Sequence, residues 1–78
     1  MRTLQEIAYD INTCWPIQYF GAKPYVEAMQ SLLSIEDTFY QDSGREIVTR
    51  FLCNAGTWRG PDARRIKAEL NKMLKDSK

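Results

Sequence analysis

The first regular pattern of apolar residues runs from position 4 to position 14. Apolar side chains recur there every three or four residues, which is the spacing of one face of a helix. Thr3 and Glu6 have the spacing of a capping box, in which each side chain accepts a hydrogen bond from a backbone N–H at the helix start. Pro16 disfavours helical geometry at the residue before it. The pattern predicts a helix over residues 4–14. Its buried face would comprise Leu4, Ile7, Ala8, Ile11 and Cys14.

A second and wider apolar pattern follows a connector that contains Pro16 and Gly21. Pro24 suits the first turn of a helix, because the N–H that proline lacks would have no partner there. The pattern predicts a helix over residues 24–33, and its width indicates packing against more than one neighbour. The apolar arc would comprise Tyr25, Val26, Ala28, Met29, Leu32 and Leu33.

The third apolar pattern predicts a helix over residues 44–55. Ser43 and Glu46 repeat the capping-box spacing at its start. Gly56 stands where a left-handed residue ends many helices. Trp58 continues the apolar face of this helix, so we expect it to pack at an edge of the core. The apolar face would comprise Ile47, Val48, Phe51, Leu52 and Ala55.

The fourth pattern predicts a helix over residues 61–75. Pro61 suits its first turn, and the carboxylate of Asp62 suits the positive end of the helix dipole. Arg65 and Lys72 lie on the same side of this helix as several acids, where local ion pairs are expected. The apolar stripe would comprise Ala63, Ile66, Leu70, Met73 and Leu74.

The segment between the second and third patterns is the least regular part of the chain. We expect one short helical turn within residues 35–40, with Phe39 or Tyr40 facing the core. No segment alternates with the period of a strand. Four helices joined by short connectors can share one core. The sequence therefore predicts a single all-α domain over residues 1–78, a small bundle of three to four short helices.

The distribution of apolar residues also bears on location. No apolar run approaches the roughly 18 residues that a membrane span needs. Glu6 and Asp10 stand where a signal peptide would have its apolar core. We therefore expect a cytoplasmic protein, monomeric or homodimeric, with no membrane partner. Four aromatic residues near the first connector would plug one end of the bundle or, alternatively, form an exposed patch for a partner; they are Trp15, Tyr19, Phe20 and Tyr25.

The composition lacks the residues of the commonest catalytic and metal sites. There is no histidine among the 78 residues, which removes the most frequent general base and metal ligand. Cys14 and Cys53 are too far apart in the sequence to form a paired zinc motif, and no glycine-rich phosphate loop is present. We expect two reduced thiols in or beside the core, a single disulfide being the alternative. The sequence thus predicts no catalytic residues, no metal and no cofactor, and we expect no enzyme.

Acidic and basic residues are unevenly distributed between the two halves of the chain. Residues 1–43 carry a net charge of −4 and residues 44–78 a net charge of +5, although the whole chain carries +1. Such asymmetry indicates an electrostatic partner. Two candidate contact surfaces follow. One is an acidic loop that could imitate phosphates, formed by Glu36, Asp37 and Asp42; the other is a basic and aromatic patch formed by Trp58, Arg59, Arg64, Lys67 and Lys75.

The basic patch has three interpretations. Its cations could be an ordinary solvated helix face, a surface that contacts a protein, or a surface that grips a phosphate backbone while Trp58 stacks a base. In its general profile the chain resembles the small accessory proteins of phages and mobile elements, among them inhibitors of bacterial defence such as anti-CRISPR proteins. No motif carries that resemblance. We expect a module that binds and modulates a bacterial protein or complex, the alternative being a small nucleic-acid-binding domain.

Overall fold

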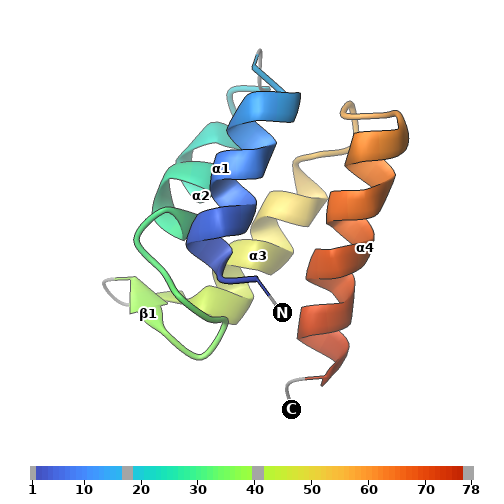
Figure 1. Cartoon of the computed structure of the whole chain (residues 1–78). Coiled ribbons are helices and arrows are strands. Elements are labelled where there is room, and N and C mark those ends of the chain that lie inside the picture. The colour runs from blue at the N-terminus through green and yellow to red at the C-terminus, as the bar shows by residue number, and fades with distance from the viewer. Residues whose placement is uncertain (1, 17–18, 40–41, 77–78) are drawn as a thin grey trace.

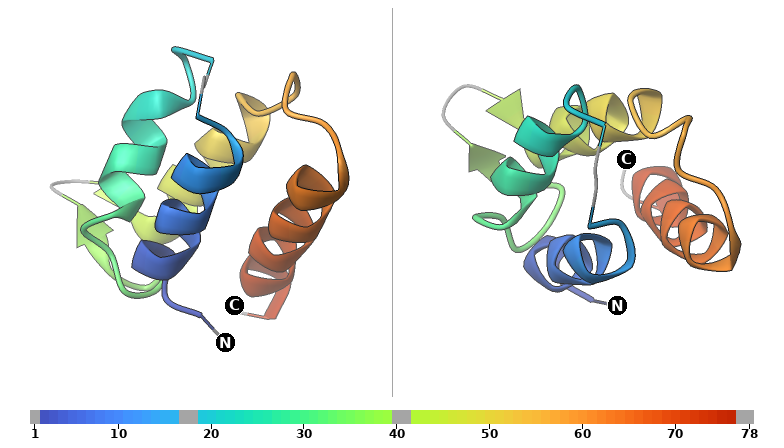
Figure 2. Two further views of the ribbon diagram at one scale, coloured as in Figure 1. Left: turned by 45° about the horizontal axis from the view of Figure 1, so that its top comes forward. Right: turned by 90° about the horizontal axis from the view of Figure 1, so that it is seen from above.

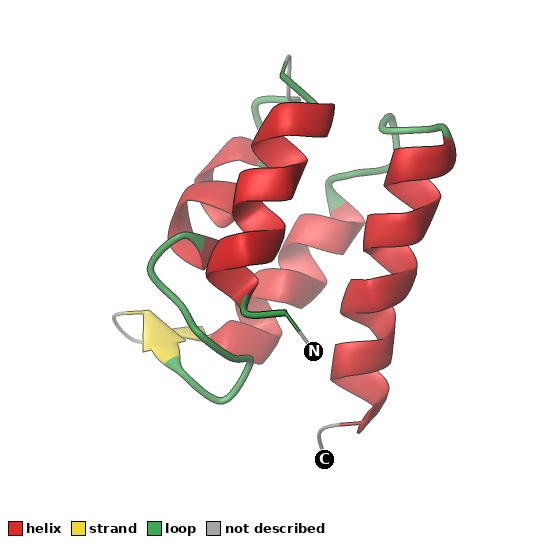
Figure 3. Ribbon diagram, in the orientation of Figure 1, coloured by secondary structure: helices red, strands yellow, loops and turns green. Residues whose placement is uncertain are grey.

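The computed structural model describes residues 2–16, 19–39 and 42–76, with only the backbone described at Phe39. Within them the chain forms four helices and one short hairpin, so the predicted all-α bundle is confirmed (Figures 1 and 3). The elements in chain order are α1 (Leu4–Cys14), α2 (Lys23–Met29), β1 (Thr38–Phe39), β2 (Asp42–Ser43), α3 (Gly44–Cys53) and α4 (Pro61–Asp76).

The four helices enclose one apolar core. Helix α1 packs against α2 and α4, and α3 packs against the same two helices (Figure 2). Phe51 is fully buried in this core, together with most of the side chains that the sequence patterns placed on the inner faces. The largest fully buried side chains besides Phe51 are Leu4, Ile7, Ile11, Met29, Leu32, Ile66 and Leu70.

The start of α1 agrees with the prediction in full. The backbone N–H of Glu6 donates to Thr3 Oγ1 at 3.1 Å, and the backbone N–H of Thr3 donates to Glu6 Oε1 at 2.8 Å. At the start of α3, the N–H of Glu46 donates to Ser43 Oγ at 3.1 Å. The Glu46 carboxylate lies 3.9 Å from Arg50 on the next turn instead of closing a second box.

Helix α2 ends at Met29, four residues before the predicted end at position 33. The carboxylate of Asp37 accepts hydrogen bonds from the backbone N–H groups of Leu33 (2.8 Å) and Ser34 (3.3 Å). A side chain that satisfies backbone donors in this way competes with the helix. Leu33 is therefore 62% exposed, although the helical pattern placed it on the buried face, whereas Leu32 is buried.

The prediction of no strand between α2 and α3 is wrong, and the expected helical turn is reduced to one tight turn, in which the N–H of Asp37 donates to the Ser34 carbonyl at 3.2 Å. Strands β1 and β2 pair antiparallel, with Thr38 opposite Ser43. The pairing brings Gly44 so close to the preceding turn that an added Cβ would lie 2.7 Å from the carbonyl oxygen of Ser34. Glycine is thus required by a close backbone approach, which no local pattern reveals. Tyr40 and the side chain of Phe39, which we expected near the core, lie outside the described residues.

The connection between α3 and α4 also departs from expectation. Helix α3 ends at Cys53 rather than at position 55, and α4 extends one residue beyond the predicted 61–75. At the end of α3 the Arg50 carbonyl accepts hydrogen bonds from both the backbone N–H of Asn54, at 3.2 Å, and its side chain, at 2.8 Å. Gly60, not Gly56, has a positive φ, at 114°. This conformation favours glycine and turns the chain into α4.

Candidate functional site

Three aromatic rings support the end of the bundle where α1 and α3 finish and α4 begins. Trp15 and Trp58 stack in parallel planes with their ring centroids 5.1 Å apart. Phe51 meets both rings edge-on, at 6.4 Å from Trp15 and 6.5 Å from Trp58. Trp58 is only 5% exposed, which confirms its position at the edge of the core. Its ring is therefore occupied by the core and is not presented for stacking on a base.

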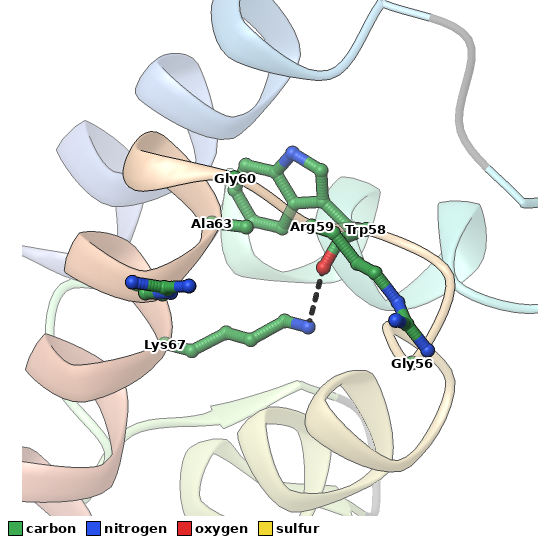
Figure 4. Close-up of a pocket in the computed structure, with 7 residues that line it drawn as sticks. Gly56, Trp58, Arg59, Gly60, Ala63 and Lys67 are labelled. Carbon is green, nitrogen blue, oxygen red and sulfur yellow. Dashed lines mark hydrogen bonds between the residues drawn. The ribbon is translucent and has the colours of Figure 1, made fainter.

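Next to this stack, the α3–α4 connection and the first two turns of α4 line an open pocket of about 370 Å³ (Figure 4). We call it the basic pocket. Three of its lining residues are cations, and no acidic side chain lines it. Its lining residues are Gly56, Trp58, Arg59, Gly60, Ala63, Arg64 and Lys67.

Lys67 links the two segments of the chain that line the pocket. Its ammonium donates to the carbonyl oxygens of Ala55 at 2.6 Å and Trp58 at 2.7 Å, and Figure 4 shows its side chain reaching from α4 to the Trp58 carbonyl. Burial lowers the pKa of Lys67, and the nearby charge of Arg59 lowers it further. Lys67 therefore fastens the α3–α4 connection to α4 and also adds a charge to the pocket.

The arginines of the chain divide into two groups. Arg2 and Arg65 pair with carboxylates, Arg50 lies 3.9 Å from Glu46, and Arg45 donates to the Leu74 carbonyl at the end of α4. Arg59 and Arg64 have neither an ion pair nor a side-chain hydrogen bond within the described residues. Both of these unpaired arginines line the basic pocket. Guanidinium groups in this state are available to an anion from outside the chain.

The structure brings together four of the five residues of the predicted basic patch. Trp58, Arg59, Arg64 and Lys67 line one pocket. Lys75 is exposed and is not among the lining residues. It lies eight residues beyond Lys67 on α4, or about 12 Å at the rise of an α-helix. Helical spacing placed it on the same side of α4 but could not show that the lining extends along this helix only as far as Lys67.

The predicted acidic loop is not a single cluster of available carboxylates. Asp37 uses an oxygen to hold the turn after α2. Asp42 belongs to β2, while Glu36 is exposed in the turn before β1. In the described parts of the chain, no group of three or more acidic or cysteine side chains could hold a metal ion.

The ion pairs that join α1 to α4 were not predicted as pairs from the sequence. Asp10 accepts from Arg2 at 2.8 Å and from Arg65 at 3.0 Å, and Arg2 also pairs with Glu69 at 2.6 Å. These hydrogen bonds, first that of Arg65 and then that of Arg2, hold the pKa of Asp10 well below its usual range. By contrast, the local pair of Arg65 with Asp62, at 3.3 Å, has a helical spacing that sequence reasoning can detect.

Both cysteines are free thiols. Cys14 is half-buried beside Asp10, with its sulfur 3.3 Å from Asp10 Oδ1. Burial and this hydrogen bond raise the pKa of Cys14. Cys53 is exposed in the last turn of α3.

Comparison with known proteins adds no relative from which a role could be carried over. No family model, no curated protein and no solved structure matches this chain. Among the helices of the described residues, none is long and apolar enough to cross a membrane.

Proposed function

We propose that this protein is a small non-enzymatic module that binds a larger bacterial protein or complex in the cytoplasm and modulates or inhibits it. The basic pocket is its contact site, and an acidic group of the partner occupies the pocket. One observation carries the proposal. The two arginines without partners within the described residues are the two that line a pocket without acidic side chains.

The same geometry gives less support to the alternative, a nucleic-acid-binding domain. The ring of Trp58 is buried in the aromatic stack. The carboxylate of Asp62 is exposed in the first turn of α4, where it pairs with Arg65, and it would repel a phosphate backbone that ran along the start of this helix. A single acidic group from a protein needs one basic pocket, whereas a polyanion binds through a series of phosphate contacts.

The test compares three immobilised proteins as baits for a bacterial lysate. They are the wild-type protein, the Arg59→Glu/Arg64→Glu variant, and a Lys72→Glu/Lys75→Glu control with the same change in net charge on exposed positions of α4. We expect a protein that is retained by the wild type and the control and lost from the pocket variant. Equal retention by all three baits would show that the pocket is not the contact site.

Fluorescence anisotropy of a labelled DNA duplex, at about 50 and 200 mM salt, tests the alternative. The proposal expects no binding at either salt concentration. Tight binding at the lower concentration with a steep loss at the higher one would assign the pocket to nucleic acid instead.

A further inference from the structure

The four aromatic residues around the first connector do not form one plug. Trp15 and Tyr25 are half-buried and pack against the core. Phe20 is 79% exposed and Tyr19 is 44% exposed. The last two rings contact each other, with centroids 4.9 Å apart and planes inclined by 52°. We call Tyr19 and Phe20 the aromatic pair. It is an exposed apolar surface that the core does not use.

The aromatic pair lies at the same end of the bundle as the basic pocket. A Cβ added to Gly21 would lie 2.6 Å from the Tyr19 ring and 3.0 Å from Asn54 Oδ1. The loop that carries the pair therefore touches the C-terminal cap of α3. The next residue along, Ala55, accepts the hydrogen bond from Lys67 in the pocket. Figures 1 and 2 show both loops at the end of the molecule where α1 and α3 finish.

We propose that the two features form one docking surface for a protein segment that carries a carboxylate and, within a few residues, a large apolar side chain. The carboxylate is bound by Arg59 and Arg64 in the basic pocket, and the apolar side chain covers the aromatic pair. This inference rests on the proposed function and specifies the chemistry of the partner.

Charge and shape favour this occupant. Planar guanidinium groups bind carboxylates through paired hydrogen bonds. The pocket is lined by Arg59, Arg64 and Lys67 without a compensating acid, so it is electrostatically complementary to such a group. An exposed Phe beside Tyr has the composition of the residues that contribute most to protein interfaces. A segment with only one of the two groups would leave half of the surface uncovered.

The test begins with a library of random dodecapeptides displayed on phage and selected on the wild-type protein. We expect the enriched sequences to combine Asp or Glu with Leu, Phe, Trp or Tyr a few residues away. One enriched peptide, synthesised with a fluorescein label, is then titrated with four proteins. These are the wild type, Arg59→Glu/Arg64→Glu, Tyr19→Ser/Phe20→Ser, and the Lys72→Glu/Lys75→Glu control.

Both site variants should weaken peptide binding by roughly tenfold or more, as expected for loss of a principal contact, while the control binds like the wild type. Circular dichroism tests whether each variant is folded, which we expect because the changes are at exposed side chains. Enrichment of acidic peptides that need the arginines but not the aromatic pair overturns this inference and leaves the proposed function intact. Absence of any peptide that depends on Arg59 and Arg64 overturns the inference, and the lysate experiment then decides the proposed function separately.

A fluorescein-labelled oligothymidine strand is titrated with the same four proteins. We expect it not to bind. Binding that depends on both the aromatic pair and the two arginines would overturn the inference and assign the surface to single-stranded nucleic acid, for which stacked aromatics and cations are the usual combination.

Discussion

Arg64 and Arg65 are neighbours on α4, yet they lie on two different edges of the helix. The cations of one edge are paired with acids, and within the described residues those of the other edge are not. On the edge that faces α1, Arg65 pairs with Asp10 and Asp62, and Arg2 joins Asp10 to Glu69. On the other edge, Arg64 lines the basic pocket without a partner in the described structure. The first edge uses its cations to join two helices. The second leaves them available, which is why we assign binding to it.

The largest expected effect comes from removing the ring that supports the basic pocket. Trp58→Ala deletes a side chain that is 5% exposed and stacked on Trp15. Large-to-small changes of buried aromatics cost about 3–5 kcal/mol of unfolding free energy. We expect a loss of this order in urea unfolding followed by circular dichroism. Trp58→Phe keeps part of the apolar volume and should cost less. Equal and small effects of both changes would contradict the role of Trp58 in the core.

A smaller loss of unfolding free energy is expected from breaking the ion pairs on the edge of α4 that faces α1. We call this the paired edge; its ion pairs join Arg2, Asp10, Asp62, Arg65 and Glu69. Asp10→Asn removes the charge that Arg2 and Arg65 share, and partly exposed ion pairs contribute about 1 kcal/mol or less each. The same urea experiment should show a loss of about 1–2 kcal/mol, because two pairs are broken. Asp76→Asn is the matched control, since Asp76 is exposed at the end of α4. Equal losses of unfolding free energy from Asp10→Asn and Asp76→Asn would show that the ion pairs of Asp10 do not stabilise the paired edge.

The paired edge should also make stability depend on pH. The folded state holds the pKa of Asp10 below its usual range, with the hydrogen bond from Arg65 as the first cause. The stabilisation is therefore present above the unfolded pKa of about 3.9 and is lost as the pH falls below it. The wild type should lose more stability than Asp10→Asn between about pH 5 and pH 3. Parallel pH profiles for the two proteins would contradict this account.

The most direct comparison of the two edges of α4 uses the neighbouring residues Arg64 and Arg65. Arg64→Ala should change the unfolding free energy by no more than about 0.5 kcal/mol, as for surface residues without partners. Arg65→Ala should lower it, because Asp10 and Asp62 lose a partner. Added salt should reduce the difference in unfolding free energy between Arg64→Ala and Arg65→Ala, because it screens these exposed ion pairs. A larger loss from Arg64→Ala than from Arg65→Ala would reverse the assignment of the two edges.

The two thiols differ in exposure, which allows a test that does not measure stability. Cys53 is exposed near the pocket end of α3, whereas Cys14 is half-buried on the paired edge with a raised pKa. The thiolate is the reactive form of cysteine. A disulfide reagent at neutral pH should therefore modify Cys53 first and Cys14 more slowly. The Cys14→Ser and Cys53→Ser variants identify each phase, and a faster reaction at Cys14 would contradict its protected position.

Much of the helical framework was predictable because its signals are local. The capping box at Thr3 and the helical spacing of apolar residues depend on neighbours one turn away, so α1 was predicted with its observed bounds. The end of α2 was not predictable in this way. It depends on Asp37 reaching back to the backbone of Leu33 and Ser34, and a helical wheel contains no information about that competition.

Most residues of the candidate site could be predicted from the sequence, but their contacts could not. Helical spacing grouped Arg64 with Lys67, and the sequence placed Arg59 next to Trp58. Spacing placed Trp58 at an edge of the core, but it did not show that Lys67 is bound to two carbonyl groups or that Lys75 lies outside the lining. These facts depend on how α4 packs against the end of α3.

The sequence by itself determined the number and order of the helices, most of the apolar face of each, the absence of histidine and the excess of cations in the second half of the chain. These properties follow from residue type and from spacing within a few turns. Only the tertiary structure decided which cations are neutralised. Asp10 and Arg65 are 55 residues apart and meet because α1 packs beside α4. An ion pair needs contact within a few ångströms, and the fold alone brings distant charges that close.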